Sequence, residues 1–406
     1  MATMESLKIA MLAPEFLPNW GGAGTYSILL ARELSKSDEV HVFTTLRPSN
    51  GRVGNSPREM EEYFNDRVKI QLVSQARDNF WYNAIFQFNV ARNLPRILSK
   101  ERYDIVHSNH AHMPDLGLKM RKLDSGCITT IHTTLSSQYK GIKSSVRSID
   151  HMEGSERMVR LGYHFLRLIE RYYLAKSDNI IFVSDFIRGE TARIAKREFH
   201  RTKLIRNGID LEHFKNGDPA PSNRTVNVLF CGRLLALKGL NNLIEAFKIV
   251  HKKCPNTRLL LVGGGNIEHW KMTAKQTGIP DDAIAFMGQM RYEEMPGIFR
   301  KGDVFVLPSM SESMPLSLLE AMACGRSAIA SNVGGIPEII THGENGYLVK
   351  PGDSVELSKR IIELVGNPDL RDRFGAKART NVEKHFDLKN MVKETREMFL
   401  SVAGDS

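Results

Sequence analysis

Residues 303–325 read DVFVLPSMSESMPLSLLEAMACG: an apolar run, a short polar loop and a second apolar segment of helical length. The run at 303–308 is short and rich in Val, as expected of a strand that is covered on both faces. Pro315 suits the first turn of a helix. The stretch therefore predicts a strand followed at once by a helix, whose free N–H groups near Met314 and Ser317 form an anion site.

The same alternation of strand-like and helix-like segments extends outward through the whole chain, which predicts parallel, doubly wound sheets. In the second half the other expected strands are 226–232, 258–263, 283–288 and 327–331. In the first half they are 7–13, 39–45, 68–73, 104–108, 127–132 and 179–184, with the clearest helices at 24–35, 83–99 and 155–176.

The length of 406 residues favours two domains of about 200 residues each. The best linker candidate is the turn-rich segment 207–222, which reads NGIDLEHFKNGDPAPS. We therefore expect an α/β protein with two tandem Rossmann-like domains, residues 1–206 and 207–387, which face each other across a ligand-binding cleft. A final helix at about 388–402 could pack back on the first domain.

The composition is that of an ordinary soluble protein, with 42% hydrophobic and 25% charged residues. No apolar stretch approaches the ~20 residues that span a bilayer, and no signal peptide is visible. The four cysteines, Cys127, Cys231, Cys254 and Cys324, are scattered, which favours a reducing compartment. We expect a cytoplasmic protein.

The net charge of +10 is concentrated in the first half of the chain, where residues 1–206 hold 31 Lys and Arg against 22 Asp and Glu. The rest of the chain holds 25 against 24. Such asymmetry can attract an anionic membrane, although a solvated basic face is an equally good interpretation. Phe80, Trp81, Phe86 and Phe88 could add apolar anchors, or belong to the core. The candidate acceptor or membrane residues are Arg188, Arg193, Lys196, Arg197 and Arg201.

Two groups of charged residues in the second half carry the strongest chemical signal. Glu312 lies in the loop after an expected strand, and Glu320 lies inside the apolar helix that follows. A buried carboxylate needs partners, which ligand hydroxyls or a structural ion pair could supply. Arg233 and Lys238 follow the first strand of the second domain, where two cations could neutralise a diphosphate, although isolated loop cations are usually surface charge.

In the first half, a glycine-rich loop and a histidine end two of the expected strands. Gly21 and Gly22 precede a helix and would let the backbone approach a phosphate or a sugar. No acid follows the second strand, which counts against a dinucleotide site. His132 ends a strand, while His107, His110 and His112 have no spacing typical of a metal site, so we expect no metal.

Taken together, these motifs resemble the retaining GT-B glycosyltransferases of the large family 4, the group 1 glycosyl transferases. The resemblance covers nearly the whole chain. The Glu312/Glu320 motif is the most specific part of it. The other matching segments, in chain order, are Gly21-Gly22, His132, Val183-Ser184, Asn207-Gly208-Ile209-Asp210, Gly232-Arg233 with Lys238-Gly239, Val262-Gly263-Gly264-Gly265, Gly334-Gly335 with Pro337-Glu338, and Asn345-Gly346.

The resemblance implies a transfer of a hexose from a nucleotide-diphosphate sugar without metal or cofactor. Arg233 and Lys238 would stabilise the leaving diphosphate, Glu312 would contact the sugar, and His132 would touch the sugar or its phosphate. Glu320 would bind the ribose hydroxyls. The other donor-binding positions that it implies are Gly21, Gly22, Asn207, Gly232, Gly263, Gly265, Met314, Pro315 and Leu316.

Two departures from the family pattern bear on specificity and structure. Ser313-Met314 replaces the usual Gly-Phe beside the sugar, and Ser37-Asp38-Glu39 replaces Gly-His before the second strand. We expect a UDP- or GDP-sugar donor and a lipid or lipid-linked glycan as acceptor, with the protein peripheral on the inner face of the membrane.

Two other interpretations remain open from the sequence. The acceptor could be soluble, such as a sugar phosphate or an inositol phosphate. A Rossmann-type oxidoreductase or epimerase is the alternative of another class. We expect no nucleic-acid partner, because no recognition motif accompanies the basic half.

Overall fold

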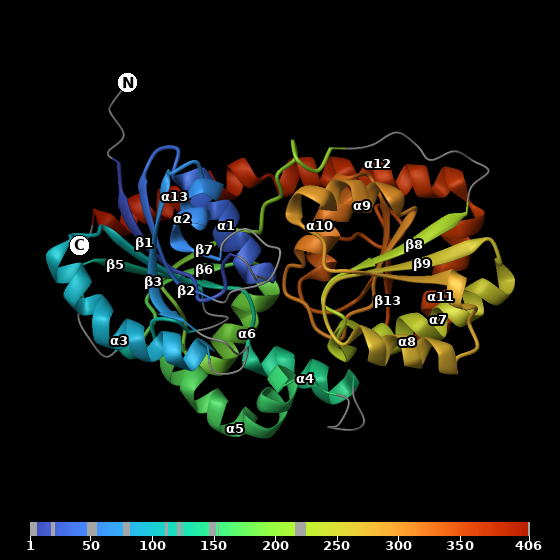
Figure 1. Cartoon of the computed structure of the whole chain (residues 1–406), viewed down its shortest axis with the longest axis horizontal. Coiled ribbons are helices and arrows are strands. Elements are labelled where there is room, and N and C mark those ends of the chain that lie inside the picture. Colours follow the sequence, from blue (N-terminus) through green and yellow to red (C-terminus); the bar gives the residue numbers. More distant parts are fainter. Residues whose placement is uncertain are drawn as a thin grey trace. The chain divides into compact units, whose positions relative to one another are not determined.

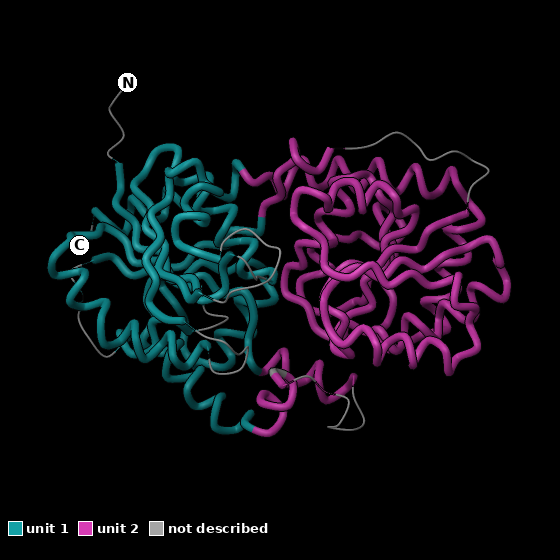
Figure 2. Tube along the Cα trace, viewed as in Figure 1, with its two compact units in different colours: residues 1–135, 162–207, 389–406 teal, residues 136–161, 208–388 magenta. Residues whose placement is uncertain are grey.

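The computed structural model describes residues 6–17, 21–46, 55–75, 82–109, 113–119, 123, 125–145, 152, 154–215 and 225–404. The chain divides into two compact units, which are coloured separately in Figure 2. Unit 1 comprises residues 1–135, 162–207 and 389–406, and unit 2 comprises residues 136–161 and 208–388.

Unit 1 is built on a seven-stranded parallel sheet (Figure 1). Strand β1 pairs with β2 on one side and β4 on the other, so that Met11 lies opposite both Val42 and His107. In spatial order the strands are β3 (Val68–Gln75), β2 (Glu39–Leu46), β1 (Lys8–Leu12), β4 (Ile105–Asn109), β5 (Gly126–Ile131), β6 (Asn179–Phe182) and β7 (Arg201–Leu204). The edge strand β7 was not among the expected strands, because its sequence RTKL is only partly buried and carries two cations.

The helices of unit 1 follow its strands in sequence, as expected for a doubly wound sheet. Helix α3 is amphipathic, with Phe86, Val90 and Leu94 buried at intervals of four residues. The helices that lie wholly or mainly in this unit are α1 (Gly22–Leu34), α2 (Pro57–Tyr63), α3 (Tyr82–Lys100), η2 (Leu116–Leu118), α5 (Gly154–Ala175), α6 (Asp185–Ala195) and α13 (Leu388–Ala403).

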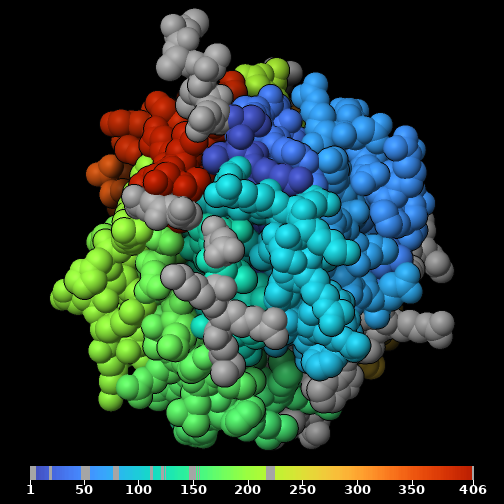
Figure 3. All heavy atoms as spheres, turned by 90° about the vertical axis from the view of Figure 1, so that its left-hand side faces the viewer, coloured from blue at the N-terminus to red at the C-terminus, as the bar shows by residue number. Residues whose placement is uncertain are grey.

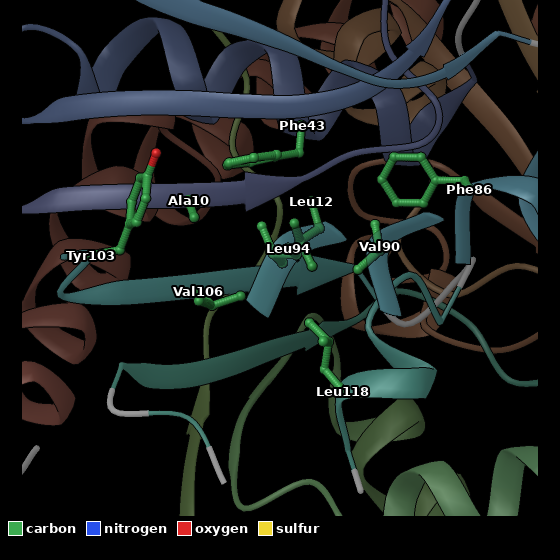
Figure 4. Close-up of a cluster of buried hydrophobic side chains, with 9 residues drawn as sticks. All are labelled: Ala10, Leu12, Phe43, Phe86, Val90, Leu94, Tyr103, Val106 and Leu118. Carbon is green, nitrogen blue, oxygen red and sulfur yellow. The ribbon is translucent and has the colours of Figure 1, made fainter. Parts of the chain in front are cut away.

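Figure 4 shows the buried cluster of unit 1 to which α3 contributes Phe86, Val90 and Leu94. These side chains pack against side chains from β1, β2 and β4, which explains why these short strands are so strongly apolar. The cluster consists of Ala10, Leu12, Phe43, Phe86, Val90, Leu94, Tyr103, Val106 and Leu118.

Ion pairs connect the C-terminal helix α13 to the rest of unit 1. Arg396 donates to both carboxylate oxygens of the buried Asp38, each at 2.8 Å. Asp38 also accepts the backbone N–H of Leu7, at the start of β1. Lys203 of β7 pairs with Glu397 at 3.0 Å. The unusual Asp38 therefore has a structural role, as a bidentate partner for α13.

Unit 2 is built on a six-stranded parallel sheet. In spatial order its strands are β10 (Ile284–Gly288), β9 (Thr257–Val262), β8 (Val226–Cys231), β11 (Val304–Leu307), β12 (Ser327–Ser331) and β13 (Tyr347–Val349). Strand β13 was not expected, because three residues are too few to give a pattern. The helices between residues 225 and 388 are η4 (Ala236–Lys238), α7 (Leu240–Lys253), α8 (Ile267–Gln276), η5 (Asp281–Ala283), η6 (Tyr292–Glu294), α9 (Met295–Lys301), α10 (Leu316–Ala323), η7 (Ile336–Glu338), α11 (Ser354–Gly366) and α12 (Pro368–His385).

Residues 136–161, which include most of α4 (Leu135–Ser145), group with unit 2, whereas the sequence had assigned them to a first domain over residues 1–206. Local packing explains this difference. A Cβ on Gly141 would lie 2.6 Å from Leu237 Cδ1 and 2.7 Å from Ser311 Cβ, so α4 approaches this part of unit 2 through a glycine. Sequence alternation does not contain this information. Part of the expected linker, residues 216–222, lies outside the described residues.

In each sheet the direction of winding reverses once, between β1 and β4 in unit 1 and between β8 and β11 in unit 2. Ligands of doubly wound sheets bind at the carboxyl ends of the strands at such a reversal. The loops that follow β1, β4 and β5 in unit 1, and β8, β9 and β11 in unit 2, are therefore the natural place for a site.

Candidate active site

In unit 2, Lys238 and Glu312 form the centre of a charged cluster at this edge of the sheet. Lys238 follows β8 at the end of η4, and its Nζ lies 2.6 Å from Glu312 Oε1. Glu312 follows β11 and also accepts a hydrogen bond from Ser309 Oγ at 2.8 Å. Both members are largely shielded from solvent, with 26% and 9% of their side chains exposed. The ammonium group is thus held at a fixed position, ready to meet an anion.

Two glycines make this cluster possible. Gly239, directly after Lys238, has a φ of +78°, and a Cβ there would lie 1.9 Å from the carbonyl oxygen of Pro308. Gly334 has a φ of +59°, and its Cβ would lie 1.6 Å from the carbonyl oxygen of Glu312. A side chain at either position would displace the loop that carries Glu312.

Glu320 lies inside α10 and is buried, although it is a carboxylic acid. Burial raises the pKa of Glu320 to about 8. The carboxyl group is close enough to Cys231, the last residue of β8, to raise the pKa of that thiol further. A carboxyl group kept in such surroundings is a candidate for binding ligand hydroxyls.

The N-terminus of α10 lies between these two glutamates in the sequence. Pro315 is the N-cap residue and Leu316 begins the helix, one position later than the sequence indicated. Met314 is buried and Leu316 is half-buried. The free N–H groups and positive dipole end of the eight-residue α10 are therefore next to the Glu312 loop.

The remaining candidates of unit 2 lie in the loops after β8 and β9. Arg233 is exposed two residues beyond β8. The β8 and β9 loops touch, because a Cβ on Gly263 would lie 1.8 Å from the carbonyl oxygen of Gly232, and Gly265 bridges Leu234. Unit 2 thus brings together Gly232, Arg233, Lys238, Gly263, Gly265, Glu312, Met314, Pro315, Leu316 and Glu320 at the ends of three neighbouring strands.

In unit 1, His132 directly follows β5 and is held by hydrogen bonding and ring contact. Its Nε2 lies 3.2 Å from Asn109 Oδ1, at the end of β4, and Asn109 Nδ2 donates to Ser27 Oγ at 2.6 Å. The ring of Tyr26 packs edge-on against His132 with centroids 4.5 Å apart. Burial raises the pKa of Tyr26 to about 12, so the phenol stays neutral. The imidazole of His132 is therefore oriented by uncharged groups.

The glycine loop of unit 1 leads into α1. Gly21 is the N-cap residue of α1, and a Cβ there would lie 2.8 Å from Glu15 Oε1. Gly22 is the first residue of the helix, is exposed, and faces open space. Asn207, the last residue of unit 1 before the chain enters unit 2, is buried. Only Gly21, Gly22 and His132 among the unit 1 candidates follow strands near the reversal of winding.

The basic residues after β6 have local partners. Arg188 pairs with Asp185, and Arg193 with Glu190 at 3.1 Å. Arg197 donates to the carbonyl oxygens of Leu174 and Ser177. Lys196 is the left-handed C-cap residue of α6, and Arg201 begins β7. Much of this charge is thus compensated locally.

Among the described residues, no group of three or more His, Cys, Asp or Glu side chains could hold a metal ion. His107 is buried against Thr130, with its pKa lowered to about 4 by burial, while His110 and His112 lie outside the described residues. In the same part of the chain, no helix is long and apolar enough to cross a membrane.

Sequence reasoning missed two residues that support the site, Ser309 and Asn109. Asn109 ends β4 and Ser309 follows β11, and their position at strand ends was the available signal. Gly334 belongs to the Gly-Gly pair already quoted as a motif, but only the structure shows that it touches Glu312.

Comparison with known families accounts for most of the chain. Residues 20–213 match the family described as Glycosyltransferase Family 4. Residues 214–381 match the family described as Glycosyl transferases group 1. The two matches adjoin at the junction of the two units, so each unit corresponds largely to one of them.

Individual proteins give the same result. The alpha-maltose-1-phosphate synthase of Mycolicibacterium smegmatis is 29% identical, over 98% of this chain and 100% of its own. A sucrose-phosphate synthase structure from Thermosynechococcus elongatus superimposes with a TM-score of 0.78 at 20% identity, covering 98% and 99% of the two chains. HepE from Anabaena, solved in complex with UDP-glucose, gives a TM-score of 0.71 at 18% identity, covering 97% and 100%.

These matches extend over both units and agree with the two parallel sheets, as in the GT-B fold. The chain belongs to the group 1 glycosyltransferases of family 4 and is a hexosyltransferase.

Proposed function

We propose that the protein is a retaining, metal-independent glycosyltransferase that moves a hexose from a UDP- or GDP-sugar to a hydroxyl of a lipid or lipid-linked glycan. The observation that carries this proposal is the Lys238–Glu312 ion pair of 2.6 Å beside the N-terminus of α10, with the buried Glu320 in the same helix. The cation and the helix N-terminus suit the diphosphate of a nucleotide, and the carboxyl of Glu320 suits its ribose hydroxyls.

In this proposal the donor lies on unit 2. Lys238 and the exposed Arg233 neutralise the diphosphate, and the buried carboxyl of Glu320 binds the ribose hydroxyls. Glu312, whose Oε1 already accepts from Lys238 and Ser309, contacts the transferred sugar. The complex of HepE with UDP-glucose supports a nucleotide sugar as donor for a protein of this fold.

The chemistry needs no protein nucleophile. The bond between the anomeric carbon and the leaving diphosphate oxygen breaks, and the acceptor oxygen forms a bond to the same face of that carbon. The acceptor's proton passes to the departing diphosphate oxygen. Lys238 and Arg233 stabilise the charge that develops on the diphosphate, which is the role a metal ion has in other transferases. His132 hydrogen-bonds to the sugar or its phosphate.

A second acceptor class has support of its own. The names of two similar proteins, alpha-maltose-1-phosphate synthase and sucrose-phosphate synthase, each contain a phosphorylated sugar. A soluble sugar phosphate is therefore the alternative acceptor, with the same donor and the same chemistry.

The test is a panel of UDP-, GDP- and ADP-hexoses, scored by thermal shift and by slow donor hydrolysis in EDTA. We expect one donor to raise the melting temperature and to be hydrolysed despite the chelator. Glu320→Ala should abolish the shift, while Glu245→Ala, an exposed glutamate on α7, should retain it. Hydrolysis that requires a divalent metal would overturn the metal-independent mechanism, and no response to any donor would overturn the donor class.

A further inference from the structure

Unit 1 exposes an unusual set of large apolar side chains on two helices. Phe88 of α3 is 65% exposed, and Phe165 and Leu168 of α5 are 68% and 65% exposed. Ile85 and Tyr172 are also exposed. We call these five residues the α3–α5 apolar surface. Such a concentration on a folded unit marks an interaction site, because single exposed apolar residues are usually scattered.

The exposed stripe of α5 is separate from the face that this helix presents to the core. Met158, Leu161, Phe165, Leu168 and Tyr172 recur at intervals of three or four residues, as on one face of a helix, and all are exposed. The core face of the same helix is formed by other residues, among them Val159, Tyr163 and Tyr173. Helix α5 therefore has two apolar faces, and only one of them is covered by the protein.

An open apolar pocket lies between helices α3 and α5. Its volume is about 580 Å³, and its lining comes from α3, η2 and α5 and includes Phe88, Leu168 and Tyr172. None of the lining residues is charged. Figure 3 shows the blue-to-cyan atoms of α3 and the green atoms of α5 on the same face of unit 1. The pocket thus continues the exposed surface inward and suits an alkyl chain.

The exposed charges of the two helices themselves have one sign. Helix α3 carries three cations, Arg92, Arg96 and Lys100, and no acid. The two acids of α5, Glu156 and Glu170, are both buried. Its exposed charged residues are Arg157, Arg167 and Arg171, so both helices offer cations and no carboxylate to solvent beside the apolar surface.

We propose that the α3–α5 apolar surface docks onto an anionic lipid bilayer. Phe88, Phe165 and Leu168 enter the headgroup region, and the pocket accepts part of an acyl chain. The flanking arginines reach lipid phosphates. A second copy of the chain fits this surface poorly, since its own α3 and α5 cations would be brought together. The inference depends on these helices alone and does not require the proposed donor or acceptor.

This surface differs from the basic stretch that the sequence had singled out. Arg188, Arg193 and Arg197 lie in or next to α6 and have the local partners described above. Helix α5 combines cations with exposed apolar side chains, which a lipid interface requires and basic charge alone does not provide.

The experiment is flotation of the full chain with vesicles of equal parts phosphatidylcholine and phosphatidylglycerol, and with phosphatidylcholine alone. We expect binding to the anionic vesicles that weakens with added salt. Phe165→Ser with Leu168→Ser should reduce the partition coefficient by at least about ten-fold. Arg167→Ala with Arg171→Ala should reduce it by up to about 30-fold at low salt.

Matched controls come from unit 2, which also exposes Met272 on α8 and Val355 on α11. Met272→Ser with Val355→Ser, and Lys252→Ala with Lys253→Ala on α7, should float like wild type. Equal loss in these controls, or wild-type protein that stays with the soluble fraction at low salt, would overturn the proposal. Binding to an acidic protein without binding to vesicles would overturn it in favour of a protein partner.

A second measurement is independent of any loss of folding. Phe165→Trp should show a blue shift and gain of fluorescence over the wild-type background when anionic vesicles are added, and Met272→Trp should not. Vesicles are tested without donor, and donor hydrolysis is tested without vesicles. Failure of docking and failure of the proposed transferase function are thus distinguishable.

Discussion

The carboxyl ends of the two sheets have the same winding but opposite chemical character. In unit 2 the loops after β8 and β11 bring together the Lys238–Glu312 pair, and α10 adds the buried Glu320. In unit 1 the loops after β4 and β5 bring together His132 and Asn109, with the neutral phenol of Tyr26 against the imidazole. One edge is built from charges and the other around an uncharged network.

Under the proposed function, the difference shows how one sheet topology could serve two tasks. In the proposed function, the diphosphate needs a cation fixed in advance, and Glu312, which also accepts from Ser309, holds Lys238 in this way. The proposed sugar or acceptor hydroxyl would need oriented neutral donors and acceptors, which His132 and Asn109 would supply. Function thus resides in the loops, while the sheets provide the positions.

The largest effect is expected from removing the cation of unit 2. Lys238→Ala should lower kcat/KM for donor hydrolysis by about 100- to 1,000-fold, because the leaving diphosphate loses a fixed positive charge. His132→Ala should lower it by only about ten-fold, since a neutral hydrogen bond is worth less than a charge-assisted one. Steady-state kinetics in EDTA compares the two variants directly.

The control is Lys252→Ala, which removes an exposed lysine of α7. It should leave kcat/KM within about two-fold of wild type, as surface charges contribute little. If His132→Ala were as damaging as Lys238→Ala, the division into a charged edge and a neutral edge would be wrong as a description of function.

The sequence predicted the strand–loop–helix elements best where the chain is most apolar. Strand β11 (Val304–Leu307) and helix α10 lie almost where residues 303–325 indicated, because both are buried and short-range patterns dominate there. Strand β7 was missed because an edge strand is half exposed and its charges resemble a loop. The grouping of residues 136–161 with unit 2 depends on tertiary packing at Gly141, which no local pattern encodes.

The candidate site was predictable to the extent that its residues lie in one contiguous segment. Glu312 and Glu320 are close in sequence, so their relation to one helix N-terminus could be inferred. Asn109 and His132 come from the neighbouring strands β4 and β5, and their hydrogen bond exists only because the sheet brings those strand ends together. The same holds for Gly334 and Glu312, which meet across two loops.

The next effect concerns stability rather than rate. Burial raises the pKa of Glu320 to about 8 from its ordinary value of 4.5, so the folded protein retains a proton that the unfolded chain releases. The stability contributed by this proton is full below pH 4.5 and is lost as the pH rises towards 8. Wild type should therefore lose up to about 1.4 kcal/mol of unfolding free energy per pH unit in this window.

Glu320→Gln removes the ionisation and keeps the shape of the side chain. Urea unfolding without donor should show the variant gaining stability relative to wild type from pH 5 to pH 8. Glu245→Gln on α7, an exposed position, should show no such trend. The same Glu320→Gln variant should bind the donor about ten- to 100-fold more weakly. A stability difference between the variant and wild type that is constant with pH would contradict a raised pKa of the buried Glu320 carboxyl group.

The smallest effect tests the neutral edge by giving it a charge. Asn109→Asp places a carboxylate about where Oδ1 now accepts from His132 at 3.2 Å. An anion at this distance should raise the pKa of His132 by about one unit or more, so the imidazolium form persists to higher pH. The pH–rate profile should move to higher pH with it, and kcat at the optimum should change by about ten-fold or less.

Proton NMR titration of the histidines gives the shift of the His132 pKa directly. The control Asn93→Asp, at an exposed position of α3, should leave both the titration and the pH–rate profile unchanged. An unaltered pH profile in Asn109→Asp, with the histidine titration shifted, would show that the protonation state of His132 does not limit the reaction and that its contribution is contact alone.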